Sequence, residues 1–237
     1  MAANVKKSSK QAPAKSGNPF MLIAAVAIVG VGVLIYLVTR PKGVSIPANV
    51  AVLEADTAGF QGYFKGSDSA PVTITEYADY QCPACQYFAT VQLPSVRRDL
   101  IETGLVRWRF RDFPLDAAHP HARLAAHSGA CADDQGKFWE QHDAIFATHA
   151  QWNVATGSGA TQIFREQARN NGLDLDAYDA CMSSAKYAGR IQASLEEGTK
   201  VGVGSTPTFL IGGRLYPGAI PSDTLAAIAR RLAGATQ

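Results

Sequence analysis

The sequence has few cysteines, little net charge and no internal repeat. It contains four cysteines among 237 residues, and its formal net charge is +2 at neutral pH. A chain this close to neutrality has no strong electrostatic attraction to nucleic acid, so we expect no nucleic-acid partner. Hydrophobic residues make up 47% of the chain and charged residues 18%, which is typical of a globular protein. The length fits one or two domains.

The first 40 residues differ in composition from the rest of the chain. Residues 1–19 are polar and lysine-rich, which is typical of a disordered tail. The uncharged run 20–38 follows, and a helix needs about 20 apolar residues to cross a bilayer. Because more basic residues precede this run than follow it, the tail is predicted to be cytoplasmic and the rest extracytoplasmic. We interpret residues 20–39 as a transmembrane signal anchor; a cleaved signal peptide and a buried core helix are the alternatives.

The order of the predicted elements indicates the fold. After an extracytoplasmic linker, residues 40–68, the domain 69–237 alternates strands and helices. Its expected elements are the strand 72–77, a Cys-x-x-Cys pair that opens a helix, the strand 105–113, a helical block at about 117–198, the hairpin 206–218 and the helix 222–234. Without the helical block, a strand–helix–strand unit joins a strand–strand–helix unit. We therefore predict an α/β thioredoxin fold with an inserted helical domain, preceded by one transmembrane helix.

The pair Cys82 and Cys85 can bind a metal, form a structural disulfide or exchange electrons. Structural zinc usually needs four ligands, and the sequence has only one such pair, so we predict no metal site. A redox disulfide needs only two sulfurs and one thiolate of lowered pKa. The N-terminus of a helix lowers the pKa of a thiol through its dipole and free N–H groups. Pro83 suits the first turn of such a helix, and a redox role for the pair is the preferred interpretation.

Four residues outside the pair bear on this chemistry. Glu76 lies inside the apolar strand that leads to the cysteines, and an acid there is costly to bury without a partner. It is interpreted as a proton acceptor near Cys85, with a solvent-facing edge position as the alternative. Asp79 is interpreted as a turn residue. Thr206 and Pro207 open the hairpin strand, where the proline is either a trans residue at a loop end or a cis-proline packed against the cysteines.

The remaining cysteines and the histidines are assigned structural roles. Cys131 and Cys181 both fall in the helical block, outside the predicted cytoplasmic segment, so we expect a structural disulfide between them. The spacing of the histidines matches no zinc motif, and no cofactor is expected. The five histidines are His119, His121, His127, His142 and His149. The segment 119–121 is interpreted as the start of a helix.

Three stretches together resemble the DsbA-like thiol–disulfide oxidoreductases. They are GSDSAPVTITEYADYQCPACQYF, RFRDFPL and GVGSTPTFLIGGRLYPGAI, and the resemblance covers roughly residues 66–235. It implies a thioredoxin fold whose helical insert covers the active site, and in some members an extra disulfide in the insert. The roles it implies are an exposed nucleophile, its buried partner, a buried acid and a cis-proline, which correspond to Cys82, Cys85, Glu76 and Pro207. Substrate is expected to contact Pro83, Ala84 and Thr206.

The resemblance implies an enzyme that oxidises cysteine pairs in exported proteins. It further implies a membrane partner of the DsbB or vitamin-K-epoxide-reductase type, linked to quinone, that reoxidises the pair. Ala84 departs from the pattern, because the strongest oxidants of the family have histidine there to stabilise the thiolate. A reductase or isomerase of the same fold and a non-catalytic chaperone or binding module are the alternatives. The expected location is the cell membrane, with the catalytic domain on the periplasmic or cell-wall side.

Overall fold

The protein is described here by a computed structural model that places residues 19–39 and 43–235. The chain divides into two compact units, Met1–Pro41 and Lys42–Gln237. The first contains the helix α1 (Pro19–Thr39), which covers the run interpreted above as a membrane span. Among the residues placed, no helix combines the length and the hydropathy required for a membrane crossing. The predicted cytoplasmic tail lies, apart from Pro19, outside the described residues.

The second unit is built on a mixed sheet of five strands in the order β1-β3-β2-β4-β5. The strands are β1 (Tyr63–Lys65), β2 (Val72–Ala78), β3 (Val106–Asp112), β4 (Thr208–Ile211) and β5 (Arg214–Pro217). Only β2 and β3 run parallel, with Val72 opposite Val106 and Ala78 opposite Asp112. The other neighbouring pairs are antiparallel. The sequence alternation in β3 becomes an alternation of faces, because successive side chains of a strand point to opposite sides.

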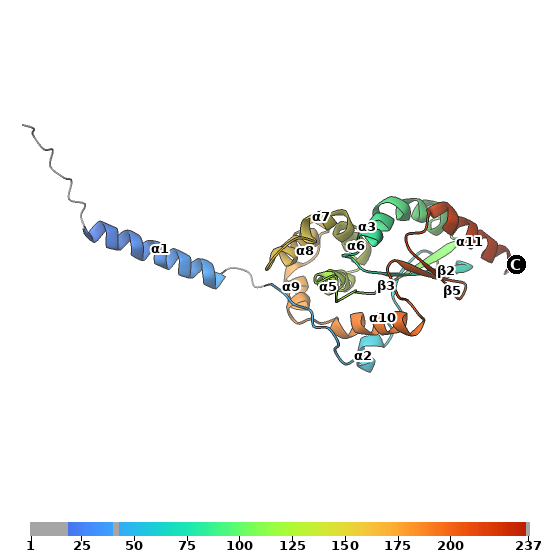
Figure 1. Ribbon diagram of the computed structural model, residues 1–237, viewed down its shortest axis with the longest axis horizontal. Helices are drawn as coiled ribbons and strands as arrows, with labels where there is room; N and C mark the ends of the chain where they lie inside the picture. Colours follow the sequence, from blue (N-terminus) through green and yellow to red (C-terminus); the bar gives the residue numbers. More distant parts are fainter. Residues whose placement is uncertain (1–18, 40–42, 236–237) are drawn as a thin grey trace, which may run out of the picture. The chain divides into compact units, whose positions relative to one another are not determined.

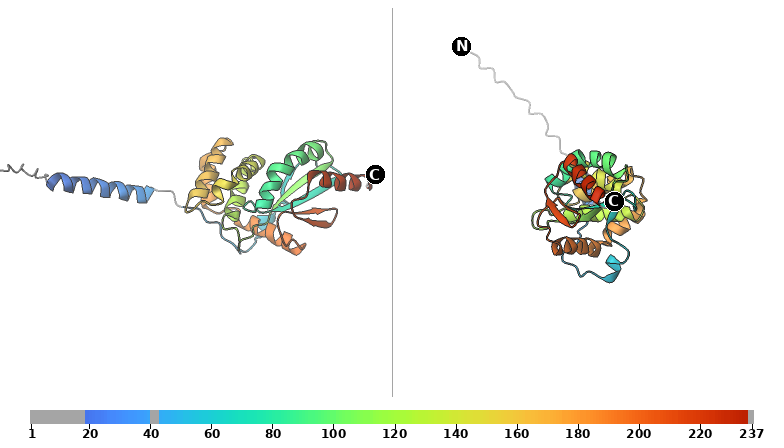
Figure 2. Two further views of the ribbon diagram at one scale, coloured as in Figure 1. Left: turned by 45° about the horizontal axis from the view of Figure 1, so that its top comes forward. Right: turned by 90° about the vertical axis from the view of Figure 1, so that its right-hand side faces the viewer.

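Helices cover both faces of the sheet (Figures 1 and 2). On one face, a helix of four consecutive segments and the C-terminal helix cover the sheet; they are α3 (Pro83–Tyr87), η1 (Phe88–Gln92), α4 (Leu93–Val96), η2 (Arg97–Ile101) and α11 (Ser222–Ala235). Their shared core includes Phe88, Trp108 and Leu225. On the other face lies α10 (Ala188–Lys200), where Tyr77 packs in a smaller cluster. The segments η1 and η2 have π-helical hydrogen bonding.

The helical block inserted between β3 and β4 forms its own layer of helices. It consists of α5 (Ala122–Asp133), α6 (Phe138–Ala147), α7 (His149–Trp152), α8 (Gly159–Asn170) and α9 (Leu175–Ser183), after which α10 returns to the sheet. Its centre is α5, where every residue from Ala122 to Ala132 is buried. One continuous core joins this layer to the sheet through Phe110, Tyr80 and Phe138. The predicted thioredoxin fold with a helical insert is therefore confirmed.

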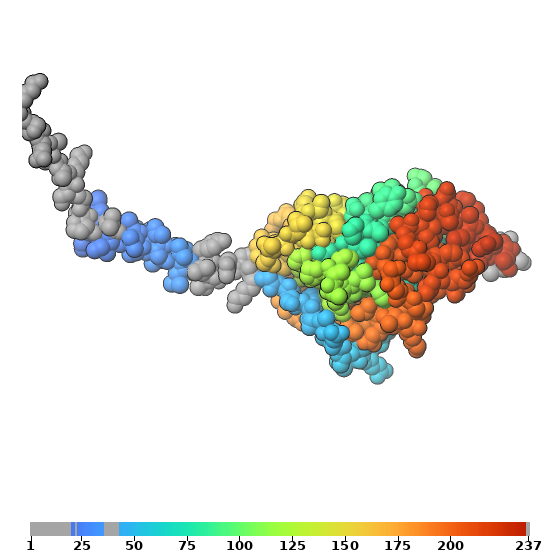
Figure 3. All heavy atoms as spheres, in the orientation of Figure 1, coloured from blue at the N-terminus to red at the C-terminus, as the bar shows by residue number. Residues whose placement is uncertain are grey.

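The predicted C-terminal boundary of the linker, residue 68, is wrong. Residues 63–65 form β1, which pairs with β3 at the edge of the sheet, and Tyr63 is only 3% exposed. The short helix α2 (Glu54–Thr57) packs on α10, where Gly189 leaves room for the Asp56 carboxylate. Figure 3 shows residues 43–60, in blue, lying along the surface of the second unit. The folded unit therefore begins well before residue 69.

Candidate redox site

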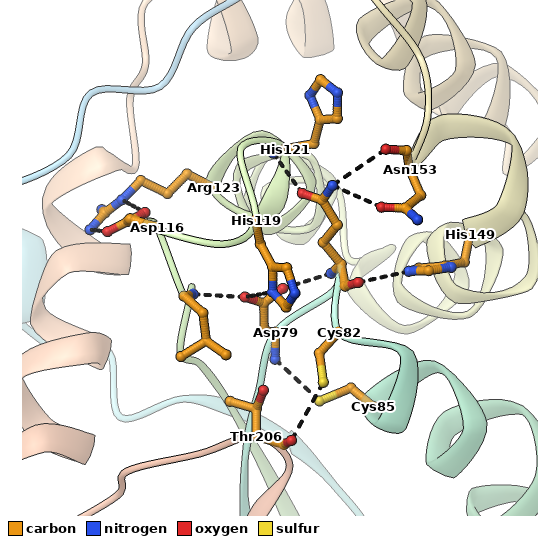
Figure 4. Close-up of polar contacts among 12 residues, drawn as sticks. Asp79, Cys82, Cys85, Asp116, His119, His121, Arg123, His149, Asn153 and Thr206 are labelled. Atoms are coloured by element: carbon orange, nitrogen blue, oxygen red, sulfur yellow. Dashed lines mark hydrogen bonds and ion pairs between the residues drawn. The ribbon is translucent and has the colours of Figure 1, made fainter.

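The two cysteines lie at the point where β2 passes into α3 (Figure 4). Cys82 is the N-cap residue of α3, with extended backbone angles, and Pro83 occupies the first turn. The apolar strand brings the chain to the carboxyl edge of the sheet, and the helix then places its free N–H groups around the Cys82 sulfur. Pro83 and Ala84 are exposed, whereas Cys85, one turn further along, is fully buried.

Cys82 has the properties of a thiolate. Its pKa is lowered from 9.0 to about 5 by a hydrogen bond with the Cys85 thiol, with further contributions from Thr206 and from the main-chain N–H groups of Cys85 and Ala84; burial opposes them. Its side chain also contacts the Thr206 carbonyl oxygen at 3.4 Å. Cys82 is 8% exposed, so the predicted nucleophile is more covered than the resemblance implied. The cause is the loop before β4, which lies against the sulfur.

Cys85 has the opposite character. Burial raises its pKa well above the ordinary value, and hydrogen bonding with Cys82 raises it further. The main-chain N–H of Asp79 donates to the Cys85 sulfur at 3.5 Å, and this donor partly stabilises a thiolate there. The pair therefore combines one thiol that ionises easily with one that keeps its proton. Such an asymmetry allows one sulfur to be attacked and the other to leave.

The Thr206–Pro207 peptide bond is cis, and both residues are buried. Pro207 precedes β4, and its carbonyl accepts from the N–H of Gly218 after β5. This contact closes the hairpin, whose turn uses Gly212 and Gly213 with positive φ angles of 55° and 77°. The fold thus brings Thr206 against Cys82, although 124 positions separate them in the sequence.

Glu76 is buried in the middle of β2, at 1% exposure, and does not face solvent. Burial raises its pKa from 4.5 to about 8, and the hydrogen bond that it accepts from Trp108 Nε1 at 3.2 Å only partly opposes this. Its charge is one of the factors that raise the pKa of Cys85. At neutral pH this carboxyl is mostly protonated, so it can both give and accept a proton.

A second buried acid, Asp112, was not singled out by the sequence. It ends β3 directly opposite Ala78, so it points to the same face of the sheet as Glu76. Burial raises its pKa from 3.8 to about 7, against the attraction of Arg111 and Arg190. Within the described part of the chain neither carboxylate oxygen has a hydrogen-bond partner. The alternation of apolar and charged residues in β3 places residue 112 on the buried face with Trp108 and Phe110. This alternation was the one feature of the sequence that could have predicted a buried acid at position 112.

Asp79 does more than form the turn assigned to it. It is 1% exposed, and its Oδ1 accepts from the N–H of Gln81 at 2.7 Å, as in an Asx turn. Its Oδ2 accepts from the N–H of Leu115 at 2.7 Å and lies 2.8 Å from Nδ1 of His119. His121 is the N-cap residue of α5 but makes no side-chain capping bond. The segment 119–121 therefore contacts the redox turn as well as starting a helix.

Cys131 and Cys181 form a disulfide between α5 and α9, with their Cα atoms 5.8 Å apart. Together with His127 they are the one group of potential metal ligands among the placed residues. The sulfurs are bonded to each other, and Nε2 of His127 accepts from the N–H of Tyr187 at 3.1 Å. The imidazole therefore has its proton on Nδ1, the atom that faces the Cys131 sulfur at 3.5 Å. This arrangement does not fit a metal ion.

The fold and the site together define a thioredoxin-fold protein with an asymmetric pair of cysteines at a helix N-terminus. The thioredoxin family model matches residues 60–229, and the chain belongs to that family. Among solved structures it is similar to alpha-DsbA1 of Wolbachia pipientis, with a TM-score of 0.65 and 24% identity over 73% of this chain and 92% of that one. The resemblance inferred from the sequence is thus confirmed for family and fold.

Two curated proteins of different names are also similar to this chain. The chain is 34% identical over 165 residues to Na(+)/H(+) antiporter NhaA 3 of Salinispora tropica, a match that covers 70% of this chain but 24% of that protein. The chain thus spans about a quarter of the length of the first curated relatives that it matches. It is also 25% identical over 160 residues to disulfide bond formation protein D of Bacillus subtilis, covering 63% of this chain and 67% of that one.

Proposed function

We propose that this protein is a thiol–disulfide oxidoreductase that oxidises cysteine pairs in exported proteins through Cys82 and Cys85. The observation that carries the proposal is the position of Cys82 at the N-terminus of α3, one turn before a fully buried Cys85. In this arrangement the pKa of Cys82 is lowered to about 5 and that of Cys85 is raised. The similarity to a disulfide bond formation protein supports the proposal. Ala84 removes one source of thiolate stabilisation, yet the main-chain donors of α3 and Thr206 lower the Cys82 pKa without it.

The reaction transfers two electrons from substrate to enzyme. The substrate loses two protons, of which Cys85 keeps one and the solvent receives the other, because Cys82 stays a thiolate. A substrate thiolate attacks the Cys82 sulfur of the oxidised pair, the Cys82–Cys85 bond breaks, and Cys85 leaves and takes up a proton. A second substrate thiolate then attacks the substrate sulfur of the mixed disulfide, so that Cys82 leaves as a thiolate. Because the low pKa makes Cys82 a good leaving group, the second step favours an oxidised substrate.

The surrounding residues are assigned roles in this reaction. Glu76 supplies and removes the proton that Cys85 must gain or lose. Substrate contact is assigned to Pro83 and Ala84, which are exposed beside the nucleophile, and to Thr206 and Pro207, which are buried in the loop before β4. The Cys131–Cys181 disulfide holds two insert helices together and takes no part in the exchange.

Repeated turnover requires an oxidant for the reduced pair. We propose an integral membrane protein that passes the electrons to quinone, of the DsbB or vitamin-K-epoxide-reductase type. The uncharged run 20–38, with lysines before it, supports a single-pass anchor that keeps the catalytic unit beside such a partner, on the extracytoplasmic side. Carbonate extraction of membranes that contain the full-length chain tests the anchor, and release of the chain would contradict it.

The function is tested by the oxidation of a reduced, unfolded protein with two cysteines. The full-length chain should form the substrate disulfide, and the Cys82→Ser variant should not. Activity retained in Cys82→Ser would refute the mechanism, and an unchanged cellular phenotype of that variant would favour a binding or chaperone role. The reduction potential in glutathione buffers decides the direction. A value near about −120 mV indicates an oxidant, whereas one near about −270 mV indicates a reductase or isomerase supplied with electrons.

A further inference from the structure

Gln81, the residue directly before the nucleophile, has a hydrogen bond on every polar group. Its side chain is buried, and its N–H donates to Asp79 Oδ1. Its amide oxygen accepts from the N–H of His121 at 2.7 Å, and its amide nitrogen donates to the side-chain oxygen of Asn153 at 2.8 Å and, more weakly, to the Asn153 carbonyl at 3.4 Å. Its main-chain carbonyl accepts from Nε2 of His149 at 2.9 Å.

All the long-range partners of Gln81 come from the helical insert. His121 begins α5, His149 begins α7 and Asn153 follows α7. His149 is itself held in place, since it is 9% exposed and its ring packs edge-on against Trp152 at 5.2 Å. Two separate segments of the insert therefore form hydrogen bonds with the residue immediately before Cys82. A lid that only covered the cysteines would not need these contacts.

The orientation of the Gln81–Cys82 peptide determines where the Cys82 sulfur lies. The N–H of this peptide donates to the Asp79 carbonyl at 3.1 Å, and its carbonyl oxygen accepts from His149. With both ends fixed, the sulfur stays close to the N–H groups of Ala84 and Cys85 that stabilise the thiolate. If the peptide rotates, these short-range donors lose their alignment, because hydrogen bonds weaken steeply with angle.

We propose that His149 and Gln81 are positioning residues through which the helical insert sets the reduction potential of the Cys82–Cys85 pair. This inference rests on the proposed redox function. Without the His149 donor the buried Gln81 carbonyl has no partner, so the turn shifts to satisfy it. The Cys82 thiolate is then less stable, the reduced form is disfavoured, and the protein becomes a weaker oxidant. A neutral side chain with an N–H donor at position 149 can replace the imidazole.

The test compares glutathione equilibria at pH 7 for full-length variants, with the redox state of Cys82 and Cys85 followed by thiol trapping. His149→Phe keeps an aromatic ring and loses the donor. The equilibrium constant of its Cys82–Cys85 pair with glutathione should become about tenfold less oxidising, the effect of weakening one hydrogen bond to the charged Cys82 thiolate. This ratio corresponds to about 30 mV. His149→Gln retains a donor and should stay within about twofold of the wild type.

His127→Phe is the matched control. His127 is another buried histidine of the insert, and it also bonds a main-chain group, the N–H of Tyr187, but it contacts no residue of the redox turn within the described structure. Its replacement should lower stability and leave the potential unchanged. If His149→Phe does not fold, Asn153→Ala is measured instead; it removes one partner of the Gln81 side chain from a half-buried position and should give a shift of about threefold in the same direction.

Two results would overturn the inference. One is an unchanged potential in folded His149→Phe, or in Asn153→Ala where that variant replaces it. The other is an equal shift in His127→Phe, which would mean that any damage to the insert has the same effect. The potential is measured without turnover, so it separates this inference from the proposed function. A wild-type chain that does not oxidise substrate would refute the function alone, because the comparison of potentials among variants would still stand.

Discussion

Replacing the buried carboxyl of Glu76 by the amide in Glu76→Gln should stabilise the protein at neutral pH. The amide has nearly the same shape, and its oxygen can still accept the hydrogen bond from Trp108 Nε1. It does not ionise, so it avoids the cost of a buried charge. The variant should also slow disulfide exchange, because the proposed proton carrier beside Cys85 is lost. A gain in stability with a loss in rate is the signature of a functional residue that is costly for folding.

The magnitude follows from the difference in pKa between the two states. The Glu76 pKa is 4.5 in its ordinary environment and about 8 in the folded protein. The folded state therefore binds the proton more tightly, so this contribution to stability is fully present below pH 4.5 and is lost as the pH rises through 8. At pH 7 the loss is about 3 kcal/mol, from about 1.36 kcal/mol for each pH unit above 4.5. At pH 5 it is under about 1 kcal/mol.

Urea unfolding of the full-length wild type and Glu76→Gln at pH 5, 7 and 8.5 measures this difference. The stability gain of the variant should grow from under about 1 kcal/mol to above about 3 kcal/mol over this range, and at pH 7 the melting temperature should rise by about 6–12 °C. Glu102→Gln, which changes an exposed carboxyl, is the control and should stay within about 0.5 kcal/mol of wild type. A gain that does not change with pH would refute the reasoning.

Two further predictions concern the cysteines. Thiolate absorbance of the reduced protein should titrate at a pH of about 5 and disappear in Cys82→Ser, because the low pKa belongs to that sulfur. A midpoint near 9, the ordinary pKa of the thiol, would show that the donors around it do not act. Replacing both Cys131 and Cys181 by alanine should lower the free energy of unfolding by about 4 kcal/mol, the chain-entropy value for a loop of 50 residues. The double variant should retain oxidase activity, and loss of activity in a folded protein would assign the disulfide a redox role.

The elements that the sequence predicted correctly are those whose signals are local. The apolar run that ends at Glu76 and Tyr77 is β2, and the alternation around Trp108 is β3. The edge strand β1 was missed because three residues give no periodicity. Its strand character depends on pairing with β3, where Tyr63 lies opposite Phe110. Pairing with a neighbouring strand can thus make a strand of a segment whose composition is typical of a linker.

The same distinction holds at the site. Cys82 and Cys85 were predicted from their spacing, and Glu76 from the cost of an acid within an apolar strand. The contacts of Asp79 with His119, and of Gln81 with His149, join positions 40 and 68 residues apart. No local pattern contains that information, because the insert must fold before the partners meet. Sequence reasoning therefore located the cysteines and the acid of the proposed site, and it missed the contacts that hold the turn before them.

The asymmetry between the two sulfurs links the chemistry to the fold. With a pKa of about 5, the reduced Cys82 is almost entirely thiolate at pH 7, so it is a good leaving group and a weak attacking nucleophile. Cys85 is buried and keeps its proton, because burial and the hydrogen bond with Cys82 raise its pKa. In the proposed reaction, a mixed disulfide at Cys82 that meets a second substrate thiol therefore resolves toward an oxidised substrate and a reduced enzyme. Because the groups that lower the Cys82 pKa lie on α3 and on the loop before β4, the direction of the proposed reaction depends on how firmly the turn before Cys82 is held.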